Sequence, residues 1–152
     1  MDTLFLVLIL STALVLGNEF SVAAFIHPSL ARAGHLRFLP AIQVFASLFG
    51  KIMPFWMGAT FVLHLVLLVA TWRWPSLRSL LLCLAAAMWL VIIVFSLVGP
   101  VPINERVKAW TVDKLPADWE RQRRRWDAMN AIRVVMIAAA FLALVAAYKD
   151  CA

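Results

Sequence analysis

The sequence predicts an all-α protein, a four-helix transmembrane bundle with an interfacial helix between the third and fourth spans. Of its 152 residues, 64% are hydrophobic and only 14% are charged, and the mean hydropathy is +0.92. A soluble domain is nearer half apolar and a quarter charged. Four apolar runs are also long enough to cross the hydrocarbon core, which takes about 20 residues. We therefore expect one membrane domain that covers residues 1–152.

The four spans differ in how cleanly they can be delimited. The second is unusually long and is interrupted by Lys51 and Pro54, which indicates a tilt or a kink. The third contains no charged residue and stops at Gly99 and Pro100. The predicted spans are residues 3–27, 41–72, 79–98 and 130–148.

The segment 99–129 is the one long polar stretch, and its charge indicates an orientation. The arginine-rich run 121–125 leads into the fourth span without a helix breaker, so we expect an interfacial helix there. The first and third loops hold nine lysines and arginines, against three on the opposite face. These loops should therefore be cytoplasmic, with both termini outside, in a bacterial inner membrane.

The same charge distribution bounds the partners. The net charge of +6 is explained by basic loops beside anionic lipid, and no nucleic-acid-binding motif is present. The expected partners are the lipid bilayer, a lipophilic small molecule and, because the spans carry small residues for close packing, a second copy of the chain in a homo-oligomer.

Two ionisable residues lie at matching depth in the first two spans. Glu19 lies about two turns before the end of the first span, and Lys51 lies at a similar depth in the second. A charge in hydrocarbon costs roughly 2.5–3.5 kcal/mol on insertion scales, so such residues usually have a partner or a task. We expect an ion pair between Glu19 and Lys51, and both a structural and a catalytic role stay open.

Further polar residues concentrate at the same end of the bundle: His27, Gln43, Asn104, Glu105, Asp127, Asn130 and Arg133. A bundle built only for structure has no need to gather donors and acceptors at one end. We infer a pocket there that takes a flat, apolar molecule with a few oxygens. Its expected walls are Phe20, Phe45, Phe49, Phe55 and Trp56.

Two short motifs lie between the end of the third span and the start of the fourth, and together with the first span they resemble a known family. Pro102-Ile103-Asn104 follows the third span, and Trp126, Asn130 and Arg133 form a W-x-x-x-N-x-x-R pattern that opens the fourth. With the His27-Pro28 end of the first span, this order resembles the anthrone oxygenase-like membrane proteins. The resemblance implies four helices and an oxygenase that converts anthrones to anthraquinones without an obvious cofactor, with O₂ as co-substrate. It also implies that Asn104, Trp126, Asn130 and Arg133 are site residues.

The first functional hypothesis is accordingly a membrane-embedded oxygenase for a lipophilic substrate. Glu19 or His27 would remove a proton, and His27 would be the better base if Glu19 is ion-paired. Arg133 or Lys51 would hold the developing enolate oxygen together with Asn104 and Asn130. The expected substrate-binding residues are Gln43, Trp56, Trp126 and Asn130.

Two other hypotheses remain open. A metal- or haem-dependent oxidoreductase would use Glu19, His27 and His64 as ligands, although no HxxxH, ExxH or CxxC spacing is present. A non-enzymatic lipid-binding or assembly subunit would use its polar end only to hold headgroups or a partner.

Overall fold

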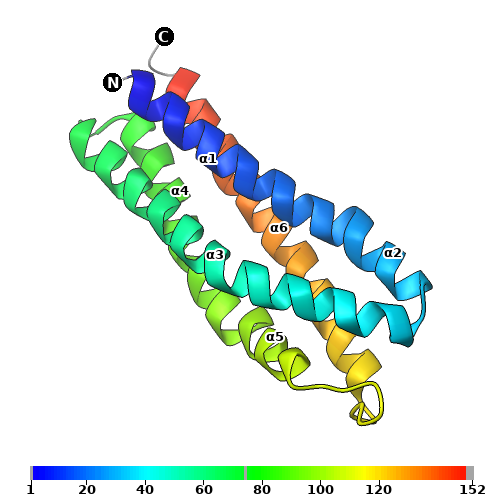
Figure 1. Cartoon of the computed structure of the whole chain (residues 1–152). Coiled ribbons are helices and arrows are strands. Elements are labelled where there is room, and N and C mark those ends of the chain that lie inside the picture. The colour runs from blue at the N-terminus through cyan, green and yellow to red at the C-terminus, as the bar shows by residue number, and fades with distance from the viewer. Residues whose placement is uncertain (1, 74, 150–152) are drawn as a thin grey trace.

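The chain folds into an elongated bundle of helices (Figure 1). The computed structural model describes residues 2–73 and 75–149, apart from the side chains of 35–37. Within these ranges no β-strand occurs, so the all-α prediction is confirmed. The elements are α1 (Asp2–Ser21), the π-helix η1 (Val22–Ile26), α2 (His27–Arg32), α3 (His35–Ala70), α4 (Leu77–Val98), α5 (Pro100–Lys108) and α6 (Trp119–Lys149).

These elements form four long rods. The four helical stretches with the length and hydropathy of a membrane span are Asp2–Arg32, Phe38–Ala70, Leu77–Lys108 and Trp119–Lys149. The beginning of α1 and the end of α6 lie at the same end of the bundle (Figure 1). The protein is therefore an integral membrane protein with a four-helix fold. Each rod is longer than the predicted span, and the depth at which the bilayer covers it stays a prediction.

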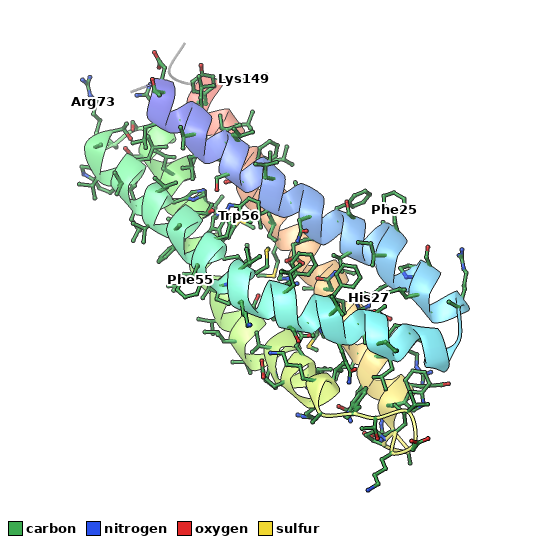
Figure 2. The ribbon with its side chains drawn as sticks, viewed as in Figure 1. Phe25, His27, Phe55, Trp56, Arg73 and Lys149 are labelled. Carbon is green, nitrogen blue, oxygen red and sulfur yellow. The ribbon has the colours of Figure 1, made fainter. Side chains whose placement is uncertain are left out.

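The outer surface of the bundle is apolar. Phe55 is 82% exposed and Val69 is 77% exposed, and Figure 2 shows Phe55 and Phe25 directed away from the other helices. In water such a surface would be an aggregation hazard, whereas in lipid it is the expected outer face.

The core consists of three layers of buried side chains along the bundle axis. The layer near the termini contains Phe5, Leu8, Leu67, Leu82, Leu144 and Ala147. The middle layer contains Val15, Met53, Met57, Trp89, Ile92, Ile137 and Ala140. The layer at the far end contains Val22, Phe38, Leu39, Ile42, Ile103, Val107 and Trp126. Between the middle layer and the far layer lie the buried charged residues Glu19 and Arg133.

Small residues line the most extensive helix–helix contact of the bundle, between α4 and α6. Ala85 and Ala86 on α4 and Ala140 and Ala143 on α6 are all buried. Between transmembrane helices, where burial in lipid supplies little driving force, such close packing is the main source of association energy.

At two glycine positions, any other residue would strain the backbone or clash with its neighbours. Gly34 joins α2 to α3 with φ of 82°, in the left-handed region. Gly99 joins α4 to α5 where the chain passes Met129 of α6. A Cβ atom at position 99 would lie 2.8 Å from Met129 Sδ and 3.0 Å from the Phe95 carbonyl oxygen. The junction between α4 and α5 therefore requires a residue without a Cβ atom at position 99.

We predict that Gly99→Ala lowers the free energy of unfolding by about 1–3 kcal/mol, because the new methyl group overpacks this junction. Denaturant-induced unfolding in detergent measures the loss. Gly17→Ala is the matched control, since a Cβ atom at position 17 meets nothing within 4 Å. Equal effects of the two substitutions would contradict the packing argument.

Candidate functional site

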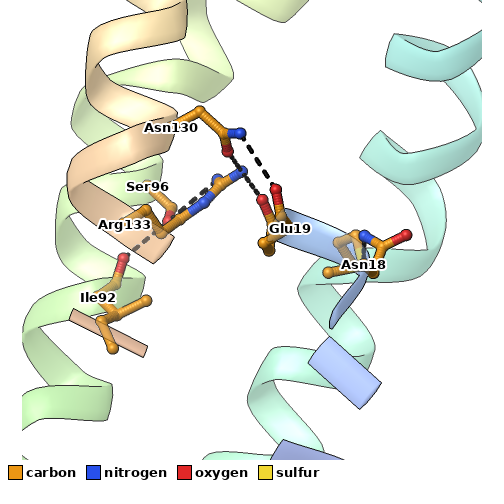
Figure 3. A network of polar contacts seen from close by, with 7 residues as sticks. Asn18, Glu19, Ile92, Ser96, Asn130 and Arg133 are labelled. Atoms are coloured by element: carbon orange, nitrogen blue, oxygen red, sulfur yellow. Dashed lines mark hydrogen bonds and ion pairs between the residues drawn. The ribbon is translucent and has the colours of Figure 1, made fainter. Parts of the chain in front are cut away.

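A buried ion pair joins α1 to α6 (Figure 3). Arg133 Nη2 donates to Glu19 Oε2 at 2.5 Å, and the two residues are 8% and 3% exposed. Arg133 Nη2 also donates to Asn130 Oδ1 at 2.7 Å, and Nη1 donates to Ser96 Oγ at 3.4 Å. Asn130 Nδ2 in turn donates to the Glu19 backbone oxygen at 3.5 Å. The network holds one negative and one positive charge, as a low-dielectric interior requires.

The expected ion pair between Glu19 and Lys51 is therefore wrong. The Glu19 carboxylate pairs with Arg133 instead, and Lys51 is exposed on α3. The predicted role of Lys51 in holding an oxyanion, which depended on this ion pair, thereby loses its support.

A second polar contact joins the same two rods one layer further along. His27 Nδ1 lies 2.7 Å from Asp127 Oδ1, and the His27 ring stacks on Trp126 with a centroid distance of 4.1 Å. Asp127 Oδ2 also accepts from Arg123 Nη1 at 3.5 Å. His27 is only 6% exposed. Because Asp127 engages Nδ1, the ring is fixed in orientation and Nε2 is the nitrogen left for another molecule.

The π-helix η1 brings Glu19 and His27 to one side of their rod. In a regular α-helix, eight residues turn the chain about 80° beyond two full turns. A π-turn accommodates one extra residue, so the same eight residues rotate roughly as seven, about 20° short of two turns. The His27 N–H accordingly bonds to the Val22 carbonyl, five residues back. Both side chains can therefore face α6.

Both contacts border a cavity of about 350 Å³. The predicted site residues that line it are Glu19, His27, Asn104, Trp126 and Arg133. Its apolar wall includes Phe45, Phe49, Met53, Met57, Ile93 and Leu97. Asn18 and Ser96 also line the cavity, and sequence reasoning missed both. Ser96 could not be distinguished from other serines in apolar helices, and Asn18 was hidden beside the charged Glu19.

Other predicted residues lie elsewhere. Gln43 donates to the backbone oxygens of Val107 and Trp110 and so ties α3 to the end of α5. Trp56 donates to Ser11 Oγ at 3.1 Å, away from the cavity. Of the expected aromatic walls, Phe20 and Phe55 face outward, at 49% and 82% exposed. Gln43 and Trp56 are therefore not among the residues that line the cavity.

The three candidate metal or haem ligands are not gathered. His64 is fully buried, donates through Nδ1 to the Thr60 backbone oxygen at 2.9 Å, and packs beside Trp89. Trp89 belongs to the middle layer, whereas His27 stacks on Trp126 of the far layer. Among the described residues, no group of three or more His, Cys, Asp or Glu side chains could hold a metal ion.

We predict that Arg133→Met lowers the free energy of unfolding by about 3–5 kcal/mol, because it leaves Glu19 buried without its partner. Combining it with Glu19→Leu should recover most of the loss, and a double-mutant cycle in detergent measures the coupling. Lys51→Met, which removes a charge outside the network, should not destabilise. Strong coupling of Lys51 to Glu19 would contradict the observed pairing.

We predict that deletion of Ala24 converts η1 to a regular helix and leaves His27 beside Asp127, because seven residues of a regular helix turn the chain by the same angle as the eight residues that contain the π-turn. With ¹⁵N-histidine labelling, the chain has only three imidazole rings to assign, and the Nδ1 shift of His27 reports its hydrogen bond. The deletion should therefore leave this shift unchanged, whereas Asp127→Leu should change it. Ala24→Leu, which keeps the residue count at an exposed position, should also leave it unchanged. A shift in the deletion variant that matches that of Asp127→Leu would contradict the angle assigned to the π-turn.

A family model described as anthrone oxygenase matches residues 43–143, well over half of the chain. The matched range includes Asn104, Trp126, Asn130 and Arg133. It begins at residue 43, after Glu19 and His27, and so does not include these two residues. No curated protein and no solved structure matches the chain.

Proposed function

The chain belongs to the anthrone oxygenase family, and on this premise we propose that it is a membrane-embedded oxygenase that oxidises a flat, lipophilic, anthrone-like substrate with O₂. The observation that carries the proposal is the contact between the half-buried Asp127 and the buried His27, which lies at the wall of an apolar cavity. A histidine oriented by a carboxylate and open to a pocket through its second nitrogen is the usual arrangement of a general base.

His27 is a better candidate base than Glu19. The Glu19 carboxylate already accepts a hydrogen bond from the Arg133 guanidinium, which stabilises it as an anion. Among the described residues, His27 Nε2 has no hydrogen-bond partner, and Asp127 stabilises the imidazolium that forms when the ring takes a proton.

The proposed reaction converts a ring CH₂ group to a carbonyl. His27 Nε2 removes a proton from the acidic CH₂ carbon, and the electron pair delocalises onto the substrate oxygen as an enolate. The electron-rich carbon reacts with O₂, and return of the proton gives a hydroperoxide at that carbon. Loss of water from this hydroperoxide leaves the carbonyl. In sum, R₂CH₂ and O₂ give R₂C=O and H₂O, and the substrate supplies all the electrons.

The remaining pocket residues support this chemistry. Arg133 and Asn104 line the same cavity, so they can hold the enolate oxygen while charge develops on it. Asn130 acts indirectly, by fixing the guanidinium through its Oδ1. Phe45, Phe49 and Trp126 supply flat apolar surfaces for a polycyclic ring system.

The membrane orientation is part of the proposal. The excess of lysine and arginine in the first and third loops supports a cytoplasmic location for the end that carries the cavity. Substrate would then be taken from the inner leaflet.

We predict that His27→Asn lowers the rate of anthrone oxidation by about 10²–10⁴-fold, the usual contribution of a general base. Asp127→Asn should lower it less, because the base remains but loses its orientation. Oxygen uptake and quinone absorbance, each corrected for the reaction without protein, measure the rate in detergent.

His64→Asn is the matched control, because it makes the same change at a buried histidine outside the cavity. Full activity of a folded His27→Asn variant would refute the assignment of the base. An absorbance spectrum and metal analysis of the purified protein separate this proposal from the metal- or haem-dependent one.

A further inference from the structure

The cavity contains an amide that the two polar contacts do not use. Asn18 of α1 lines the cavity and is half-buried. Its Nδ2 donates only to Met53 Sδ, at 3.8 Å, and Figure 3 shows it turned away from the network around Arg133. Among the described residues, its Oδ1 has no hydrogen-bond partner. A thioether is a weak acceptor, so the hydrogen-bonding capacity of Asn18 is almost unused.

Its polar neighbours at the cavity are already occupied. Glu19 pairs with Arg133, and Ser96 donates to the Ile92 backbone oxygen while it accepts from Arg133. An amide without a good partner in an apolar pocket is unfavourable. A ligand that brings an oxygen atom to Asn18 would relieve this cost.

We propose that Asn18 binds an oxygen substituent of the substrate ring and makes the pocket selective for oxygenated rings over unsubstituted ones. This inference rests on the substrate class of the proposed function. Asn18 Oδ1 can accept from a ring hydroxyl, and Nδ2 can donate to a hydroxyl or carbonyl oxygen in place of Met53 Sδ.

The position of Asn18 separates it from the reacting oxygen. Neighbouring residues of a helix point about 100° apart, so Asn18 and Glu19 face different parts of the cavity. The oxygen bound by Asn18 is then distinct from the enolate oxygen near Arg133. Asn18 is therefore a specificity residue, and sites that hydrogen-bond a substrate hydroxyl discriminate against analogues that lack it.

The test is equilibrium binding without turnover. Anthrone and 2,7-dihydroxyanthrone, which differ only in two ring hydroxyls that lie too far from the ring carbonyl to bond it, are titrated under argon into the detergent-purified full chain. Quenching of tryptophan fluorescence gives the dissociation constants. We expect the wild type to bind the dihydroxy compound about 5- to 10-fold more tightly, as one or two neutral hydrogen bonds allow. Asn18→Leu should abolish this preference and leave the affinity for anthrone nearly unchanged.

Two further variants serve as controls. Asn18→Ala, which removes the amide without adding a branched side chain, should give the same loss of preference. Ser21→Ala removes a polar side chain of the same helix that bonds its own backbone, at Gly17, outside the cavity, and should keep the preference.

Three results would overturn the proposal: a wild type that binds both compounds equally, variants at position 18 that still prefer the dihydroxy compound, or variants that bind both compounds more weakly by the same factor. Because binding is measured without oxygen, it does not depend on the reaction. A wild type that binds with the expected preference but does not oxidise either compound would refute the proposed reaction and leave the role of Asn18 supported.

Discussion

The structure depends on burying the charge of Glu19 between apolar layers. An unpaired carboxylate is costly in a membrane interior, so the helices must bring a cation to it and satisfy that cation's other donors. Arg133 supplies the charge, and Asn130 and Ser96 accept from its guanidinium. These contacts fix α1, α4 and α6 relative to one another. The cavity lies beside this fixed corner, and α3 forms much of its remaining wall.

The architecture could be predicted from the sequence, because hydropathy and length alone require four membrane-spanning helices. The partner of Glu19 could not be predicted from depth in the membrane alone. The helical periodicity of the buried residues, however, indicates Arg133. Arg133 shares a stripe on α6 with the buried residues Asn130, Ile137, Ala140 and Leu144, at steps of three and four. Lys51 is out of step with the buried Ala46, Met53 and Met57 on α3. Both lie at suitable depth, but only Arg133 faces the interior. Angular position therefore decides the pairing.

His27 shows a limit of that same reasoning. A regular helix would place it about 80° away from Glu19, on a different side of the rod. The π-turn that corrects this angle lies in the apolar run Val22–Ile26, which carries no sequence signal for a change of helix type. π-turns are rare and often occur at functional sites, where they are retained for the geometry they create. The dyad with Asp127, separated by one hundred residues, was thus beyond what spacing could predict.

The contacts also give a physical meaning to the W-x-x-x-N-x-x-R pattern of α6. Trp126 stacks on His27, Asn130 donates to the Glu19 backbone, and Arg133 binds the Glu19 carboxylate. All three residues of the pattern thus contact the α1 rod, although the family match does not extend to it. Asp127, within the same pattern, orients the His27 ring. Since each of these residues contacts Glu19 or His27, the pattern is best understood as one half of a site whose other half is the end of the rod Asp2–Arg32, and α6 positions the His27 ring.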